Sequence, residues 1–245
     1  MTGNAHKKQA RDLQAATGIS YSRALRICNV LHSPLPVTLG AGTDGQPVRI
    51  DLNEYACGGD GPHLLITGPT GCGKSALAAT LAEQLAQAGV KLYLRGGSNT
   101  AFPASATHVT ADTVSTAMDK LCTMRENQLR CTNSRDMQEH LSQGHLMHPA
   151  AVVVDDSAMT GDQATVKMLS RIGRALGIHL ILTGLPDEEP TMFGALIRLD
   201  GAHPDREITC HGTVYSRNHA DPLAHRYRLD FSFVVPASGA TPPDH

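Results

Sequence analysis

The sequence lacks any apolar run long enough to cross a membrane. A bilayer-spanning helix needs roughly 20 consecutive apolar residues, and no segment of the 245-residue chain approaches that length. Residues 1–14 also lack the apolar core of a signal peptide. We therefore expect a cytoplasmic protein that reaches a membrane only through a partner protein.

The six cysteines lack the spacing of a zinc site or a disulfide framework. They are scattered along the chain and none forms a C-x-x-C pair, which is typical of reduced thiols. The densest group of histidines, His140, His145 and His148, also lacks the spacing of a zinc site. We expect these histidines to be solvated loop residues.

The chain as a whole lacks the positive charge that is typical of nucleic-acid-binding proteins. Its formal net charge is −2, which gives no global argument for nucleic-acid binding. Residues 1–31 differ, because five basic residues there stand against one acidic residue and give a local charge of +4. We predict a basic helical hairpin in this region. It is either a small DNA-binding or docking element or a solvated helical cap packed on the core.

Residues 63–75, HLLITGPTGCGKS, carry the most specific functional pattern. A short apolar run leads directly into G-x-x-x-x-G-K-S, the phosphate-binding loop (P-loop) that follows a strand and opens a helix. The glycines let the backbone turn its N–H groups inward, and the helix start adds the positive end of its dipole. Lys74 supplies a cation for the β- and γ-phosphates of ATP, and the Ser75 hydroxyl is a ligand for Mg²⁺. The expected nucleotide-binding residues are Gly68, Pro69, Thr70, Gly71, Cys72, Gly73, Lys74, Ser75 and Ala76. Since Cys72 lies within this loop, alkylation of its thiol is expected to block nucleotide binding.

A second apolar segment completes the expected site. Residues 151–154 are followed by two aspartates, the pattern of a Walker B strand. We expect Asp155 to orient Mg²⁺ and Asp156 to act as the base that activates the attacking water. Many related ATPases have glutamate at the second position, and the shorter aspartate reaches about 1.5 Å less far, which would slow hydrolysis. Thr183, at the end of a further apolar strand, is either a sensor of the γ-phosphate or a capping residue.

Strands and helices alternate along the chain in the manner of an α/β fold. The predicted strands are 63–67, 90–94, 150–154 and 178–183, and the predicted helices are 75–88, 113–130 and 162–176. This alternation indicates a central, mostly parallel sheet flanked by helices, with the nucleotide at the carboxyl edge of the strands. Residues 206–234 are expected to add one or two antiparallel edge strands.

The chain divides into four predicted parts. These are a basic helical hairpin at 1–33, a β-hairpin leader at 34–60, a P-loop ATPase core at 61–235 and a disordered tail at 236–245. Pro34 and Pro36 mark the first boundary. The dipeptide Asp44-Gly45 predicts the turn of the β-hairpin.

Several segments together resemble the ATPase modules of the FtsK/SpoIIIE superfamily, especially the EccC ATPases of type VII secretion. Residues 42–52 match a leader that reads G-x-D-G-x-P-V-x-x-D-L and precedes the P-loop strand. Arg95-Gly96-Gly97 resembles an F-K-G-G segment after the second strand. Residues 174–182, RALGIHLIL, resemble the strand entry R-A-x-G-I-H-L-I-L. The resemblance covers roughly residues 35 to 200.

The resemblance implies a RecA-like P-loop ATPase that moves double-stranded DNA or protein. It also implies a homo-oligomer, for which the family's arrangement is a hexameric ring. ATP would lie between subunits and meet an arginine from the neighbour. Arg198, Arg206 and Arg217 are candidates for this role, or are surface charges. The chain departs from the family at Asp156, where the family has glutamate, and at Leu185, where it has a polar glutamine. Both departures weaken the prediction of motor activity more than the prediction of ATP binding.

Three classes of function are therefore open. The first is an ATPase that acts on double-stranded DNA in translocation, plasmid transfer or segregation. The second is an ATP-gated DNA- or protein-binding regulatory module with little hydrolysis. A secretion-type ATPase that acts on a protein substrate is a further alternative to the DNA-directed enzyme. The third is a small-molecule kinase, for which the sequence offers no arginine-rich lid segment.

Overall fold

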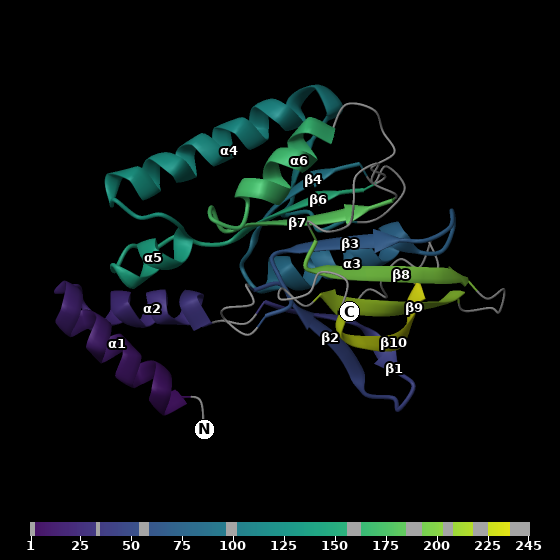
Figure 1. Ribbon diagram of the computed structural model, residues 1–245, viewed down its shortest axis with the longest axis horizontal. Coiled ribbons are helices and arrows are strands. Elements are labelled where there is room, and N and C mark those ends of the chain that lie inside the picture. The colour runs from purple at the N-terminus through teal and green to yellow at the C-terminus, as the bar shows by residue number, and fades with distance from the viewer. Residues whose placement is uncertain are drawn as a thin grey trace, which may run out of the picture.

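The computed structural model describes residues 3–32, 35–53, 59–96, 102–155, 163–184, 193–202, 208–217 and 225–235. These residues form a ten-stranded sheet with helices on both faces (Figure 1). The strands are β1 (Pro36–Gly42), β2 (Pro47–Asp51), β3 (His63–Thr67), β4 (Lys91–Arg95), β5 (Thr107–Val109), β6 (Ala150–Val154), β7 (Ile178–Thr183), β8 (Ala195–Ala202), β9 (Ile208–Arg217) and β10 (His225–Val235). The helices are α1 (Gly3–Thr17), α2 (Tyr21–His32), α3 (Lys74–Gln87), α4 (Ala111–Cys131), α5 (Met137–Ser142) and α6 (Gln163–Ile172). Of the described helices, none combines the length and apolarity of a membrane span.

The parallel half of the sheet contains the strands that the sequence predicts. Its order is β8-β3-β7-β6-β4-β5, and every neighbouring pair in it is parallel. The P-loop follows β3, and β7 separates β3 from the Walker B strand β6. The predicted α/β class, a RecA-like fold with a mostly parallel sheet, is confirmed.

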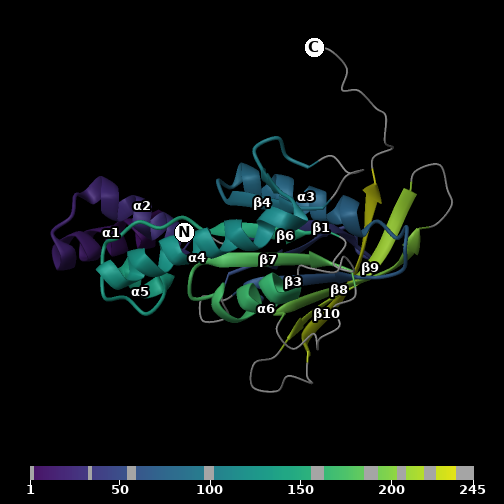
Figure 2. The ribbon, with the colours of Figure 1, turned by 90° about the horizontal axis from the view of Figure 1, so that it is seen from above.

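Helices on both faces explain why the central strands are apolar throughout. Every residue of β6 and β7 is buried, as expected for parallel strands that lie between two helical layers. Leu77 and Leu81 of α3 pack on one face, and Met118 of α4 and Leu169 of α6 pack on the other. Figure 2 shows α3 and α6 on opposite sides of these strands.

The antiparallel half differs from the sequence prediction. Residues 206–234 were expected to form edge strands, but β9 and β10 lie inside the sheet in the order β8-β9-β10-β1-β2. The β1–β2 hairpin lies outside them, because Ala41 of β1 pairs with Ser232 of β10. A Cβ atom at Gly40 would collide with the Ser232 carbonyl, so this approach requires glycine. The predicted tail at 236–245 lies outside the described residues.

The predicted N-terminal helical hairpin is present as α1 and α2. The two helices pack through the small residues Ala10, Ala24 and Cys28, and Gly18 between them has a φ of 71°. Ile27 of α2 is fully buried in the main core, beside α5. The hairpin thus lies at one end of the molecule, where α2 packs beside α5 (Figure 1). Its five basic side chains, Lys7, Lys8, Arg11, Arg23 and Arg26, are all exposed.

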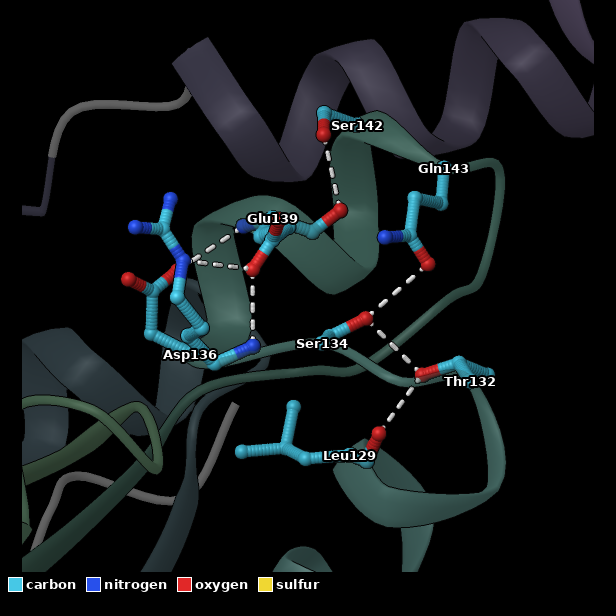
Figure 3. A network of polar contacts seen from close by, with 8 residues as sticks. Leu129, Thr132, Ser134, Asp136, Glu139, Ser142 and Gln143 are labelled. Carbon is cyan, nitrogen blue, oxygen red and sulfur yellow. Dashed lines mark hydrogen bonds and ion pairs between the residues drawn. The ribbon is translucent and has the colours of Figure 1, made fainter.

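A polar network fixes α5 after the end of α4 (Figure 3). The Asp136 carboxylate caps α5 by accepting a 2.9 Å hydrogen bond from the Glu139 amide. The Ser134 hydroxyl lies 2.9 Å from the Thr132 hydroxyl and donates to the Gln143 side chain at 3.0 Å. These bonds order a segment whose sequence is too polar to be fixed by apolar packing alone.

The predicted solvation of the histidine cluster is wrong for His140. This residue lies in α5 and is only 5% exposed, and its Nδ1 lies 2.8 Å from the Thr132 hydroxyl. Burial lowers the pKa of His140, and the neighbouring His145 ring adds to the effect. His148, in contrast, is exposed.

A buried cation attaches α4 to the amino-terminal ends of the parallel strands. Arg125 is 5% exposed. Its guanidinium donates hydrogen bonds of 2.7 Å to the carbonyls of Leu176 and His148. These carbonyls precede β7 and β6, so one side chain joins the helix to the starts of two strands. Burial lowers the pKa of Arg125.

Arg125→Met should destabilise the protein strongly. The two carbonyls would stay buried without their donor, so we expect the free energy of unfolding to fall by about 2–4 kcal/mol. Chemical denaturation followed by circular dichroism measures this change. Arg130→Met, at an exposed position of the same helix, should cost less than about 0.5 kcal/mol. Equal effects of the two substitutions would contradict the role of Arg125.

Candidate nucleotide-binding site

The loop between β3 and α3 has the backbone of a phosphate-binding loop. Gly68 and Gly73 have φ values of 146° and 91°, which residues with a Cβ atom rarely adopt. A Cβ at Gly68 would also lie 2.5 Å from the Leu199 carbonyl oxygen and 2.7 Å from Cys72 Sγ. Strand β8 therefore packs directly against the loop at Gly68. Pro69, Thr70 and Gly71 are exposed, so the rest of the loop is open to a ligand.

Lys74 lies at the mouth of this loop. Its Nζ donates hydrogen bonds to the carbonyls of Gly68 at 2.9 Å and Pro69 at 2.8 Å. The side chain is partly exposed, so the ammonium group can exchange these carbonyls for phosphate oxygens. α3 begins at Lys74, and its first amide groups add a partial positive charge at the same place.

The Asp155 carboxylate joins three elements at the carboxyl edge of the sheet. It is 4% exposed, and one oxygen, Oδ1, accepts hydrogen bonds from Ser75 at 2.9 Å and Thr183 at 2.7 Å. The Asp155 amide donates to the Arg95 carbonyl at 2.8 Å. The P-loop helix, β6 and β7 thus meet at one carboxylate, and β4 supports it from the other side.

The structure also contains a support that the sequence analysis missed. Gly96 follows β4 with a φ of 96°, and a Cβ there would collide with the Asp155 carbonyl. Only glycine lets β4 end this close to the Walker B aspartate. In the sequence, the consecutive glycines of Arg95-Gly96-Gly97 are the feature that indicates such a close backbone approach.

The described structure shows no contact between the Asp155 carboxylate and the remaining residues that the sequence predicts. Asp156, Leu185 and Arg206 lie outside the described residues. Arg198 is exposed and pairs in register with Thr67, directly before the P-loop. Arg217 lies in β9.

The fold and the site together define a P-loop nucleoside triphosphatase domain. A family model described as "AAA domain" matches residues 59–192, and the chain belongs to this family. The resemblance to the FtsK/SpoIIIE-like EccC ATPases is confirmed by the relatives that follow.

Two relatives in sequence are described as secretion system proteins. The chain is 30% identical over 191 residues to the ESX secretion system protein EccC of Thermomonospora curvata, covering 65% of this chain and 14% of EccC. It is 29% identical over 194 residues to the ESX-4 secretion system protein EccC4 of Mycobacterium tuberculosis, covering 66% of this chain and 16% of that protein. The chain therefore corresponds to a small part of these relatives.

Two solved structures share the fold. The cytoplasmic domain of the Thermomonospora curvata type VII secretion ATPase EccC superposes with a TM-score of 0.63 at 22% identity, covering 94% of this chain and 32% of that one. The pCW3 conjugation coupling protein TcpA superposes with a TM-score of 0.51 at 21% identity, covering 66% of this chain and 53% of TcpA. The chain thus shares its fold with a domain of a secretion ATPase and with a conjugation coupling protein.

Thr183→Val should impair the site without unfolding the protein. Valine has the same shape but removes the hydroxyl that donates to Asp155, so we expect ATP hydrolysis to slow by roughly tenfold. Thr213→Val is a matched control, because the Thr213 hydroxyl donates a 2.7 Å hydrogen bond to Asp230 in the antiparallel half. The measurement is the steady-state rate of ATP hydrolysis of both variants, compared with the rate of the unsubstituted protein. A similar loss in both would mean that the effect is structural.

Thiol labelling should separate Cys131 from the buried cysteines. Cys131 is exposed, whereas Cys28, Cys72, Cys122 and Cys210 are buried. Burial raises the pKa of the Cys122 thiol to about 11, and the nearby carboxylates add to the effect, so this thiol stays protonated at neutral pH. Timed iodoacetamide labelling with peptide mass mapping should find Cys131 modified before these four buried cysteines. Early modification of Cys72 would contradict its 1% exposure. The predicted block of nucleotide binding by alkylation of Cys72 stays a prediction, and the loop must open before the reagent can reach this thiol.

Proposed function

We propose that this chain binds and hydrolyses ATP at the P-loop. One observation carries the proposal. Oδ1 of Asp155 accepts hydrogen bonds from both Ser75 and Thr183, so the Walker B carboxylate and the P-loop hydroxyl already lie together. Two oxygen-bearing side chains and the Lys74 ammonium group lie at one edge of the sheet, where the phosphates of a nucleotide would lie, and this supports the proposal.

The same residues fit a magnesium ion. Mg²⁺ prefers oxygen ligands and is usually held by one or two protein groups, water and substrate phosphates. The Ser75 hydroxyl and Asp155 carboxylate form such a set, and their 2.9 Å hydrogen bond places both oxygens within reach of one ion. The ion would neutralise charge on the phosphates of ATP.

The chain supplies the remaining groups for phosphoryl transfer. Lys74 would exchange its bonds to the loop carbonyls for bonds to the β- and γ-phosphates. Asp156, directly after the Walker B aspartate in the sequence, would take a proton from the attacking water. Thr183 would hold Asp155 in place and report the state of the γ-phosphate through this hydrogen bond.

Double-stranded DNA is the proposed substrate on which the ATPase acts. The five exposed basic side chains of α1 and α2 provide a phosphate-binding surface. A relative in structure, TcpA, is described as a conjugation coupling protein. Translocation, plasmid transfer or segregation would each use such a surface. We further propose that the protein works as a homo-oligomer, with Arg198 as a candidate arginine for the neighbouring site because it is exposed beside the P-loop strand.

A protein substrate is the second candidate. It is favoured by the two EccC relatives, both described as secretion system proteins. A secretion-type ATPase would use the same nucleotide chemistry. The two candidates differ in what stimulates hydrolysis, and this difference can be measured.

The purified protein should hydrolyse ATP in the presence of Mg²⁺, and long double-stranded DNA should accelerate turnover. Lys74→Ala and Asp156→Asn should each lower turnover by about a hundredfold or more, because they remove the phosphate cation and the base. Lys120→Ala, at an exposed position of α4, is the control and should leave turnover unchanged. ATP binding without turnover would favour the ATP-gated regulatory module. Turnover that ignores DNA would favour a protein substrate.

The basic hairpin should make DNA binding sensitive to salt. Replacing Lys7, Lys8 and Arg11 of α1 by glutamine should weaken binding and reduce the slope of affinity against salt concentration, because fewer counterions are released from DNA. Fluorescence anisotropy with a labelled duplex measures both quantities. An unchanged slope would place the DNA contact elsewhere on the protein, while ATP turnover without DNA should remain at the unsubstituted level.

A further inference from the structure

A cavity lies at the end of the sheet opposite the nucleotide site. Its volume is about 310 Å³. Its walls come from α2, α5, the end of α3 and the amino-terminal ends of β6 and β7. Figure 1 shows α2 and α5 at this end, away from the arrowheads of β3, β6 and β7. The cavity is therefore built where the N-terminal hairpin meets the core.

The cavity is separate from the P-loop. Ile178 lines it at one end of β7, and Thr183 contacts Asp155 at the other end. Five residue steps along a strand correspond to about 17 Å. A ligand of moderate size in this cavity would not touch the nucleotide.

Positive charge dominates the described walls of the cavity. Arg26 of α2 and Arg174, between α6 and β7, both line it, and none of its described lining residues is aspartate or glutamate. The buried guanidinium of Arg125 lies directly behind the wall, because it donates to the carbonyl of His148, which lines the cavity. The hydrogen bonds of Arg125 in the described structure go to backbone carbonyls, which offset its charge only in part. The described part of the wall thus carries two guanidinium groups and no carboxylate, a lining that favours an anion.

The remaining walls are apolar or uncharged. Val30, Met137 and Ile178 contribute aliphatic surface. His179 is also part of the wall, and burial lowers its pKa to about 4, so the ring is neutral at physiological pH. Its Nδ1 lies 3.2 Å from the Pro62 carbonyl. A ligand that matches this lining carries an apolar or planar body together with one anionic group.

We propose that this cavity binds a small organic anion, a carboxylate or phosphate ester on an apolar body. The volume lies at the lower end of the range for small-molecule sites, and the concave apolar lining suits a compact molecule better than the phosphate backbone of DNA. Arg26 and Arg174 would bind the anionic group by charge-assisted hydrogen bonds. The ligand would thereby join α2 to the core, because one arginine belongs to the hairpin and the other to the segment before β7.

The fluorescent anion 8-anilinonaphthalene-1-sulfonate is a suitable probe, since it combines a planar apolar body with a sulfonate. We expect one saturable site on the full chain. Arg26→Gln and Arg174→Gln should each weaken binding by about fivefold or more, the effect of losing one charge-assisted hydrogen bond. Phenyl phosphate and hexanoate should compete with the dye. Displacement by phenyl phosphate alone would assign a phosphate ester, and displacement by hexanoate alone would assign a carboxylate.

Matched variants separate this site from others. Arg23→Gln on α2 and Arg171→Gln on α6 remove exposed charges that do not line the cavity, so they should leave dye binding unchanged. Lys74→Ala should also leave it unchanged, because that lysine belongs to the P-loop. Equal weakening by the control variants, displacement by ATP, or the absence of a saturable site would each overturn the proposal. None of these outcomes depends on ATP hydrolysis, so the proposed function is tested separately.

Discussion

The shared carboxylate oxygen of Asp155 is the contact on which the nucleotide site depends. A buried carboxylate is costly unless its oxygens are hydrogen-bonded, and here the hydroxyls of Ser75 and Thr183 satisfy the same atom. The Asp155 amide is held by the Arg95 carbonyl, so the backbone at this position is fixed to the end of β4. The hydrogen bonds of the carboxylate then fix the P-loop helix and β7 relative to β6. Preorganisation of this kind lowers the cost of binding and of reaching the transition state.

The parts of the fold that the sequence predicts are those with a local signal. A strand buried on both faces reads as a continuous apolar run, as in residues 150–154 and 178–183, and the glycine-rich loop and the Walker B aspartates have fixed spacing. Strand order in the antiparallel half has no such signal. It depends on pairing between Ala41 and Ser232, which lie far apart in the sequence. The sequence shows that residues 206–234 form strands, but not which strands they join.

The burial of Arg125 follows from its position in the sequence, but its hydrogen-bond partners do not. Met118, Leu121, Arg125 and Leu129 are spaced three or four residues apart, so helical periodicity places the arginine on the apolar face of α4. An arginine at such a position must find acceptors inside the protein. Here they are the carbonyls of Leu176 and His148, before two strands that only the tertiary fold brings to this helix. The position was predictable from spacing, whereas the partners were not.

Rigid elements connect the nucleotide site to the cavity at the other end of the sheet. α3 begins at Lys74 and its C-cap, Ala88, lines the cavity, while β7 runs from the cavity to Thr183. The α1–α2 hairpin meets the core chiefly where α2 packs on α5, and it takes no part in the pairing of the described sheet. An anion held by Arg26 and Arg174 would attach this hairpin more firmly to the core. Its effect on ATP hydrolysis would then pass through the position of the basic hairpin, and so through the surface proposed to contact DNA, rather than through a change in the P-loop.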